Sequence, residues 1–295
     1  MNLSLSRSFP IAKAALAAAV IACVVALTCS LVGCASGGTG SSSADADNTS
    51  ASTDGKTLRV AMELAYPPFE TKDDAGNPEG LAVDFIRDFG AAYGYDVQIE
   101  NTAWDGLIPS LQSDKADLVI SSMTITDERK QSVDFSDAYA MAQLAILANA
   151  DSGVASIDDL NQPGKKVAVK TGSTGDVYAT KNLTNAEIVR LADESACVTA
   201  VVQGKADGFL YDQLTIYRNH QANPDTTEAV FIPFQDAEEW GIAVKKGNTE
   251  LLDQLNAFIA QSKTDGEFDR LTEKYLADEK KAFDQYGFKW FFDFE

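Results

Sequence analysis

The chain has 295 residues and a formal net charge of −20 at pH 7. This acidic excess argues against nucleic-acid binding and against electrostatic docking on anionic lipid. Three of the four cysteines lie at or before residue 34, which leaves Cys197 alone in the rest of the chain. That distribution excludes a disulfide framework and a metal cluster built from thiols.

Residues 1–34 have the pattern of a lipoprotein signal peptide, with a basic start and an uncharged, mostly apolar run over 14–33. Small residues precede Cys34, so we expect cleavage and lipidation at this cysteine; Cys29 follows bulkier residues and fits less well. The alternative is an uncleaved transmembrane anchor. Residues 35–55 contain no large apolar side chain, and we expect them to form a flexible tether.

Strand-like and helix-like patterns alternate over the remaining chain, which indicates an α/β fold. For example, Leu81, Phe85, Phe89 and Tyr93 recur at four-residue spacing, as on one face of a helix. The strands that we expect cover 58–64, 96–102, 118–120, 165–170, 186–192 and 208–212. The helices that we expect cover 80–95, 105–117, 173–183, 194–207, 213–220 and 251–259.

The end of the chain, residues 281–295, is unusually rich in aromatic side chains. Two interpretations remain open for it. These side chains can pack back onto the folded region, or they can form an exposed patch that docks a partner.

One arginine has a position typical of a ligand-binding residue. Arg129 follows the short apolar strand 118–120 and lies near the start of a helical turn. Ligands of α/β proteins gather at the carboxyl ends of strands, and a guanidinium is well suited to a carboxylate. The alternative is a surface arginine paired with Asp127 or Glu128.

Four segments together resemble the extracellular solute-binding proteins of family 3, the amino-acid receptors of ABC importers. The similarity extends from about Leu58 to about Tyr275 at matching order and spacing. The segments are LRVAMELAYPPFE (58–70), WDGLIPSLQSDKADLVISSMTITDERKQSVDFSD (104–137), KVAVKTGSTGDVYA (166–179) and GKADGFLYDQ (204–213).

The resemblance implies a two-lobed α/β fold of the type II periplasmic-binding-protein kind, with a two-strand hinge and a ligand cleft between the lobes. Lobe 1 would comprise residues 56–147 and 236–295, and lobe 2 residues 148–235. We expect the two crossings near 147–151 and 234–240. Such a hinge permits closure around a ligand.

The resemblance also implies how the amino-acid backbone is held. Arg129, Thr124 and the helix start at Thr174 would bind the carboxylate, while Asp212 and the Ser122 carbonyl would accept from the ammonium group. The alternatives are that Asp212 merely caps the helix after it, and that the turn at 172–174 merely caps its own helix.

For the ligand side chain, Tyr66 and Trp104 match aromatic residues that sandwich the ligand in relatives, although either could be a core residue. Glu63 stands where relatives often carry aspartate. Lys170 matches a lysine that some relatives aim at the ligand, although it could be a surface charge. If Glu63 and Lys170 both point inward, a polar, net-neutral side chain suits the site.

The function implied is that of a monomeric, lipid-anchored extracytoplasmic protein that captures an amino acid and delivers it to an ABC permease and its ATPase. We expect no cofactor, no metal and no catalysis. One alternative is an enzyme on the same fold, a cyclohexadienyl dehydratase acting on prephenate or arogenate. His220, the only histidine, lies at the far end of a predicted helix and is a poor acid or base for that reaction. The other alternative is a sensory or adhesive lipoprotein, which only the aromatic end supports.

Overall fold

A computed structural model describes residues 56–286 and 289–294. The predicted signal peptide, Cys34 and the tether over 35–55 lie outside the described residues. Within the described residues, no helix is long and apolar enough to cross a membrane.

The first of two five-stranded sheets has the strand order β4-β1-β5-β14-β6. Strand β1 runs parallel to β4 and β5, and β14 runs antiparallel to β5 and β6. Because side chains alternate along a strand, Leu58 and Val60 of β1 face one hydrophobic cluster with α1, whereas Ala61 faces another with α2. The elements are β1 (Lys56–Met62), α1 (Leu81–Tyr93), β4 (Tyr95–Asn101), η1 (Trp104–Gly106), α2 (Leu107–Gln112), β5 (Leu118–Val119), α3 (Asp127–Lys130), β6 (Val133–Phe135) and β14 (Ala243–Lys245), with a small hairpin of β2 (Thr71–Lys72) and β3 (Pro78–Glu79).

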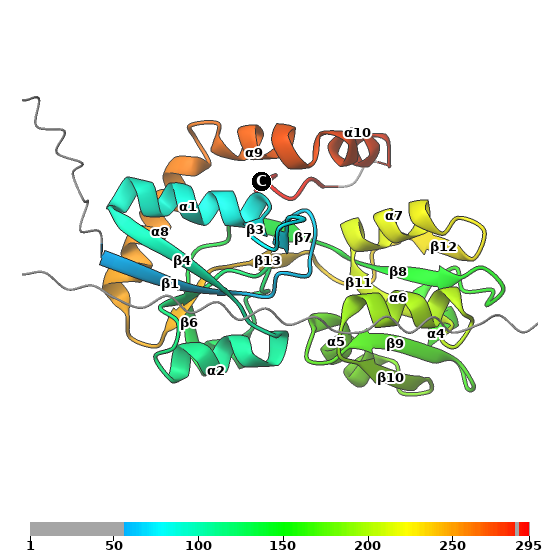
Figure 1. The fold of residues 1–295 in the computed structure, drawn as a ribbon. Coiled ribbons are helices and arrows are strands. Elements are labelled where there is room, and N and C mark those ends of the chain that lie inside the picture. The colour runs from blue at the N-terminus through cyan, green and yellow to red at the C-terminus, as the bar shows by residue number, and fades with distance from the viewer. Residues whose placement is uncertain (1–55, 287–288, 295) are drawn as a thin grey trace, which may run out of the picture. The chain divides into compact units, whose positions relative to one another are not determined.

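The second sheet has the order β10-β9-β11-β8-β12. Helices α6 and α7 cover one face of it and α4 and α5 the other, each with its own apolar cluster (Figure 1). Cys197 is buried in the first of these clusters, and burial raises the pKa of its thiol to about 12. The elements are β8 (Leu144–Asn149), α4 (Ile157–Leu160), β9 (Lys166–Lys170), α5 (Thr174–Asn182), β10 (Glu187–Leu191), α6 (Glu194–Val202), β11 (Gly208–Asp212), α7 (Gln213–Ala222) and β12 (Thr227–Val230).

Two short strands connect the two sheets. Strand β7 (Ala140–Ala142) pairs antiparallel with β13 (Glu238–Trp240) as a separate two-stranded sheet. The chain first crosses from one sheet to the other at β7, earlier than the expected position near 147–151. The reason is that Leu144–Asn149 pairs with both β11 and β12, inside the second sheet. Residues 144–147, assigned to lobe 1 from the sequence, therefore belong to the second sheet.

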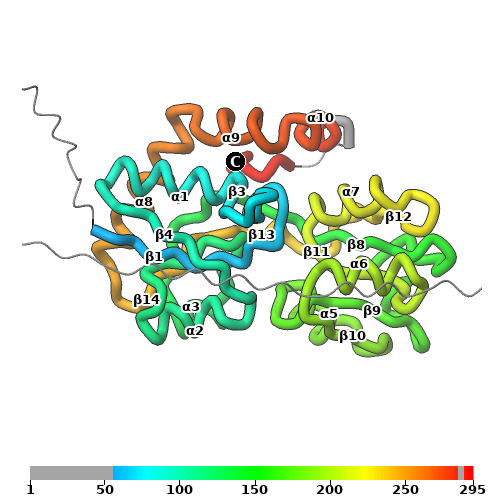
Figure 2. The backbone as a smooth tube through the Cα atoms, viewed as in Figure 1, coloured from blue at the N-terminus to red at the C-terminus, as the bar shows by residue number. Residues whose placement is uncertain are grey.

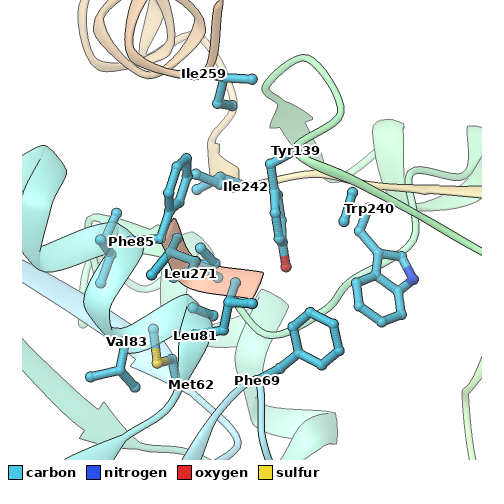
Figure 3. Close-up of a cluster of buried hydrophobic side chains, with 14 of the residues drawn as sticks. Met62, Phe69, Leu81, Val83, Phe85, Tyr139, Trp240, Ile242, Ile259 and Leu271 are labelled. Carbon is cyan, nitrogen blue, oxygen red and sulfur yellow. The ribbon is translucent and has the colours of Figure 1, made fainter. Parts of the chain in front are cut away.

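The C-terminal part returns to the first sheet as α8 (Thr249–Ser262) and α9 (Glu267–Tyr275), and α10 (Ala277–Tyr286) continues from there toward α7. After α10 the chain turns back beside α9 (Figure 2). Trp290 and Phe291 are buried in the same cluster as α1, α8 and α9, and the backbone N–H of Met141 in β7 donates to the Phe291 carbonyl at 2.7 Å. The aromatic end thus packs back onto the folded region, the first of its two interpretations. Figure 3 shows the cluster between α1 and β13, with Phe69, Tyr139 and Trp240 close together.

Candidate functional site

A pocket lies between the two sheets, beside β13. It contains eight of the nine residues that the sequence assigned to the ligand, and Lys170, the ninth, contacts one of them. The lining residues are Glu63, Tyr66, Glu70, Trp104, Ser121, Ser122, Thr124, Arg129, Leu144, Ser173, Thr174, Tyr211, Asp212, Glu238 and Trp240.

Arg129 spans the two sides of this pocket. The Thr126 hydroxyl caps α3 by accepting from the Arg129 backbone N–H at 3.2 Å. The guanidinium donates to the Thr124 carbonyl at 2.7 Å and to the Gly172 carbonyl, on the other side, at 3.2 Å. It also lies 5.2 Å from the centre of the Trp104 ring. Burial lowers the pKa of Arg129, but an arginine stays charged in a protein. These contacts turn the guanidinium toward the pocket and away from Asp127.

Two threonines from opposite sides converge on one carboxylate oxygen. The hydroxyls of Thr124 and Thr174 donate to Oε2 of Glu238 at 2.9 Å and 2.8 Å. The other oxygen, Oε1, accepts from the Gln235 amide at 2.8 Å. Sequence reasoning did not select Glu238, because the segment around it matches no motif. The one sequence feature that could have pointed to Glu238 is its position within the expected crossing at 234–240.

Asp212 combines the two roles that the sequence left open. Its Oδ1 caps α7 by accepting from the N–H groups of Leu214 and Thr215 at 2.9 Å and 3.1 Å. Its Oδ2 is buried and makes no well-formed hydrogen bond in the described part of the chain, and the same holds for the Tyr66 hydroxyl. Burial raises the pKa of Asp212, and the nearby Tyr66 hydroxyl opposes part of that rise. A buried acceptor without a partner costs free energy unless a ligand supplies a donor.

Glu63, which lines the pocket, forms an ion pair with Lys170, which does not line it. Lys170 is only 4 % exposed, and its ammonium group also lies 5.1 Å from the centre of the Trp104 ring. Lys170 therefore contacts Glu63 and the Trp104 ring rather than the pocket. The two charges neutralise each other.

Glu70 is a second acidic residue that sequence reasoning did not select. It is 1 % exposed and accepts from the Ser122 hydroxyl at 3.1 Å. Burial raises its pKa well above the usual range. Ser122 itself has a left-handed backbone with φ of 47°, uncommon for a residue other than glycine. The signal for Glu70 was its position directly after the apolar Phe69 within the 58–70 segment.

The start of α5 is held tightly against β11. The Ser173 hydroxyl accepts from the Asp176 N–H at 3.2 Å, and the Asp176 carboxylate accepts from the Gly172 N–H at 3.0 Å. A Cβ on Gly175 would lie 2.5 Å from the Leu210 carbonyl oxygen. This contact fixes the turn at 172–174 relative to the pocket. The turn at 172–174 thus caps its own helix, with Ser173 as the N-cap residue.

In the described residues, no group of three His, Cys, Asp or Glu residues is arranged to hold a metal ion. His220 does not line the pocket. It lies near the end of α7, and its ring is 3.3 Å from the hydroxyl of Thr227 in β12. What the pocket offers is a set of fixed hydrogen-bonding groups and opposite charges.

Two sheets joined by a pair of short strands, with a polar pocket between them, define a two-lobed solute-binding protein. The family model of the bacterial extracellular solute-binding proteins, family 3, matches residues 58–278, and the chain belongs to that family. The lobes are accordingly named lobe 1, which holds the first sheet, and lobe 2, which holds the second.

Similar proteins are binding proteins as well. The chain is 35% identical over 258 residues to a probable histidine-binding protein of Neisseria gonorrhoeae, covering 86% of this chain and 94% of that one. It is 33% identical to an L-arginine-binding protein of Pseudomonas aeruginosa, covering 79% and 90%. A crystal structure of an ancestral amino-acid-binding protein, a precursor of cyclohexadienyl dehydratase, matches with a TM-score of 0.68 and 38% identity over 74% of this chain and 94% of that one. These relatives identify the chain as a binding protein rather than an enzyme.

Proposed function

We propose that this protein captures a free amino acid between its two lobes and delivers it to an ABC importer. The observation that carries the proposal is the unpartnered Oδ2 of Asp212, buried opposite the Arg129 guanidinium in one pocket. A zwitterion presents a cation and an anion two bonds apart, and a pocket with opposite charges on facing walls binds both. Amino-acid binding in the similar proteins from Neisseria and Pseudomonas supports the proposal.

The proposed binding mode divides the ligand between the lobes. The ammonium group would donate to Oδ2 of Asp212 and to the Ser122 carbonyl. The carboxylate would accept from Arg129, from the hydroxyls of Thr124 and Thr174, and from the start of α5, where backbone N–H groups favour an anion. Ligand contacts on both lobes would favour the closed state.

The proposed ligand has a polar or positively charged side chain. Tyr66 and Trp104 supply flat apolar walls. Because Lys170 is already paired with Glu63, it leaves no free positive charge for an acidic side chain. Glu70 adds a carboxyl group that makes no ion pair among the described residues. A guanidinium, ammonium, imidazole or amide could donate to it.

Delivery to the membrane completes the proposal. The closed form would be recognised by a permease and its ATPase, and a lipid on Cys34 would keep the monomeric receptor close to them. Acyl chains supply such anchoring by burying their methylene groups. Mass spectrometry of the protein purified from membranes would test the lipid, with a Cys34→Ser variant as control.

A thermal-shift screen against the twenty common amino acids, followed by calorimetry, tests the binding function. We expect one or a few amino acids with polar or cationic side chains to bind, and none to bind a variant in which Asp212→Ala removes the ammonium acceptor. A screen in which no amino acid shifts the melting temperature would contradict the proposal.

A further inference from the structure

The Glu238 carboxylate lies where the proposed function places the carboxylate of the ligand. We propose that Glu238 is an internal competitor for the amino acid, an intramolecular carboxylate that holds the lobes together until the ligand displaces it. This inference rests on the proposed function for the identity of the carboxylate site. The bridge that Glu238 forms between the lobes, called the latch below, does not depend on which ligand binds.

The geometry of the two threonines carries the inference. Thr124 lies in lobe 1 after β5, and Thr174 is the first residue of α5 in lobe 2. Both hydroxyls donate to the same oxygen, Oε2 of Glu238. One carboxylate oxygen that accepts from one hydroxyl on each lobe is a bridge between the lobes. Hydrogen bonds to an ionised acceptor are also stronger than neutral ones.

Glu238 makes only some of the contacts that a ligand carboxylate would make. A ligand can therefore displace it. Arg129 makes its hydrogen bonds to the carbonyls of Thr124 and Gly172, so Glu238 acts on the guanidinium only through its charge. A free carboxylate can take the two hydroxyls and the guanidinium together, in the two-pronged arrangement that arginine favours. The ligand therefore gains an interaction that Glu238 does not make.

Glu238 also has an alternative position when displaced. It lies at the first residue of β13, half-buried, and its other oxygen is held by the amide of Gln235. Residues 231–237 form neither helix nor strand, and Gln143 donates to the Gln235 carbonyl at 2.8 Å. Gln235 can thus retain the displaced carboxylate beside the hinge.

The consequence is a lower apparent affinity than the site could give. A ligand that must first displace an internal group binds only to the fraction of molecules in which the site is free. If Glu238 occupies the site in about nine molecules of ten, its removal tightens binding about tenfold. The ligand-free protein also spends more time closed than a receptor without this bridge.

Calorimetry of three variants of the full chain tests the competition, with the amino acid found in the screen as probe. We expect Glu238→Ala to bind about tenfold more tightly, and Glu238→Gln about threefold, because an amide oxygen keeps one acceptor but loses the charge. The matched control is Glu239→Gln, which makes the same charge change on the same strand at an exposed position and should leave the affinity unchanged. Equal or weaker binding by both Glu238 variants would overturn the inference.

A distance measurement without ligand separates this inference from the proposed function. Spin labels on keto amino acids in place of the exposed Lys115 and Lys181, one on each lobe, leave the cysteines untouched. We expect Glu238→Ala to shift the distance distribution toward longer values and Glu239→Gln to leave it unchanged. An identical distribution in Glu238→Ala would refute the latch, even if the protein binds amino acids. If neither wild type nor Glu238→Ala binds any amino acid, the proposed function fails while the distances still decide the latch.

Discussion

Two regions of opposite chemistry meet at Trp240. On one side it lines the candidate pocket, near which the lobes touch through an ion pair and through hydrogen bonds. On the other it packs against Phe69 and Phe291, with ring centres 5.2 Å and 5.5 Å away. The first region joins the lobes by directional polar contacts. The second joins the C-terminal residues to lobe 1 by apolar packing, and it also reaches lobe 2, because Leu214 and Tyr217 of α7 belong to the same cluster.

The difference shows how a stable lobe can be combined with movement between the lobes. Apolar burial is non-directional and is lost only when water enters, so the aromatic region keeps lobe 1 intact during closure. Polar contacts can be exchanged for water or for a ligand at small net cost. Helix α10 lies near both lobes, because Glu279 pairs with Arg218 of α7 at 3.5 Å. This division leads to four predictions.

The largest effect is expected in the aromatic region. Phe291→Ala should lower the free energy of unfolding by about 3–5 kcal/mol, because the side chain is fully buried and its removal leaves a cavity. Urea denaturation measures this. Phe294→Ala, at a half-buried position in the same segment, is the control and should cost about 1 kcal/mol or less. Equal losses in the two variants would show that the segment is not part of the core.

In the polar region, Arg129→Ala should weaken amino-acid binding about 100-fold or more, since it removes the guanidinium from a charge-assisted pair. The free energy of unfolding should change little. Calorimetry and urea denaturation measure the two quantities, and Arg270→Ala, on the outer surface of α9, is the control. Full affinity in Arg129→Ala would remove the proposed site.

The ion pair between Glu63 and Lys170 should respond as a unit. Lys170→Met alone leaves the partly buried Glu63 without its partner, and we expect affinity for the amino acid to fall about tenfold, because an unpaired charge opposes closure. Adding Glu63→Gln should restore most of that loss. A double-mutant cycle measures the coupling. Additive effects would mean that the pair does not act across the closing lobes.

The smallest effect concerns pH. Burial raises the pKa of Glu194 to about 8, whereas an exposed glutamate titrates near 4.3. Between these values the folded protein holds a proton that the unfolded chain has released, so stability falls as pH rises toward 8. Because the Glu194 side chain is still partly exposed to solvent, we expect Glu194→Gln to remove only about 1–2 kcal/mol of this loss between pH 5 and 8. Urea denaturation at the two pH values measures it, with the exposed Glu228→Gln as control. An unchanged pH dependence in Glu194→Gln would contradict the shift.

The sequence predicted the α/β fold and the family, and eight of its nine ligand-site residues line one pocket. The position of Arg129 after an apolar strand drew attention to it, but the roles expected of Arg129 and Asp212 came from the resemblance to family 3. Glu238 was not, because its position depends on the irregular path of residues 231–237 rather than on a repeating pattern. The boundary near 147 was misplaced because the run Leu144–Asn149 is apolar on both faces and fits the centre of either sheet.

The contact between Gly175 and the Leu210 carbonyl has a consequence for how this receptor can change. Any larger residue there would act as a wedge between helix and sheet, and would tilt the first turn of α5 away from the cleft. Such a substitution would impair recognition without touching the ligand. Substitutions of side chains along the pocket walls can therefore change the ligand preference, whereas position 175 has to remain glycine.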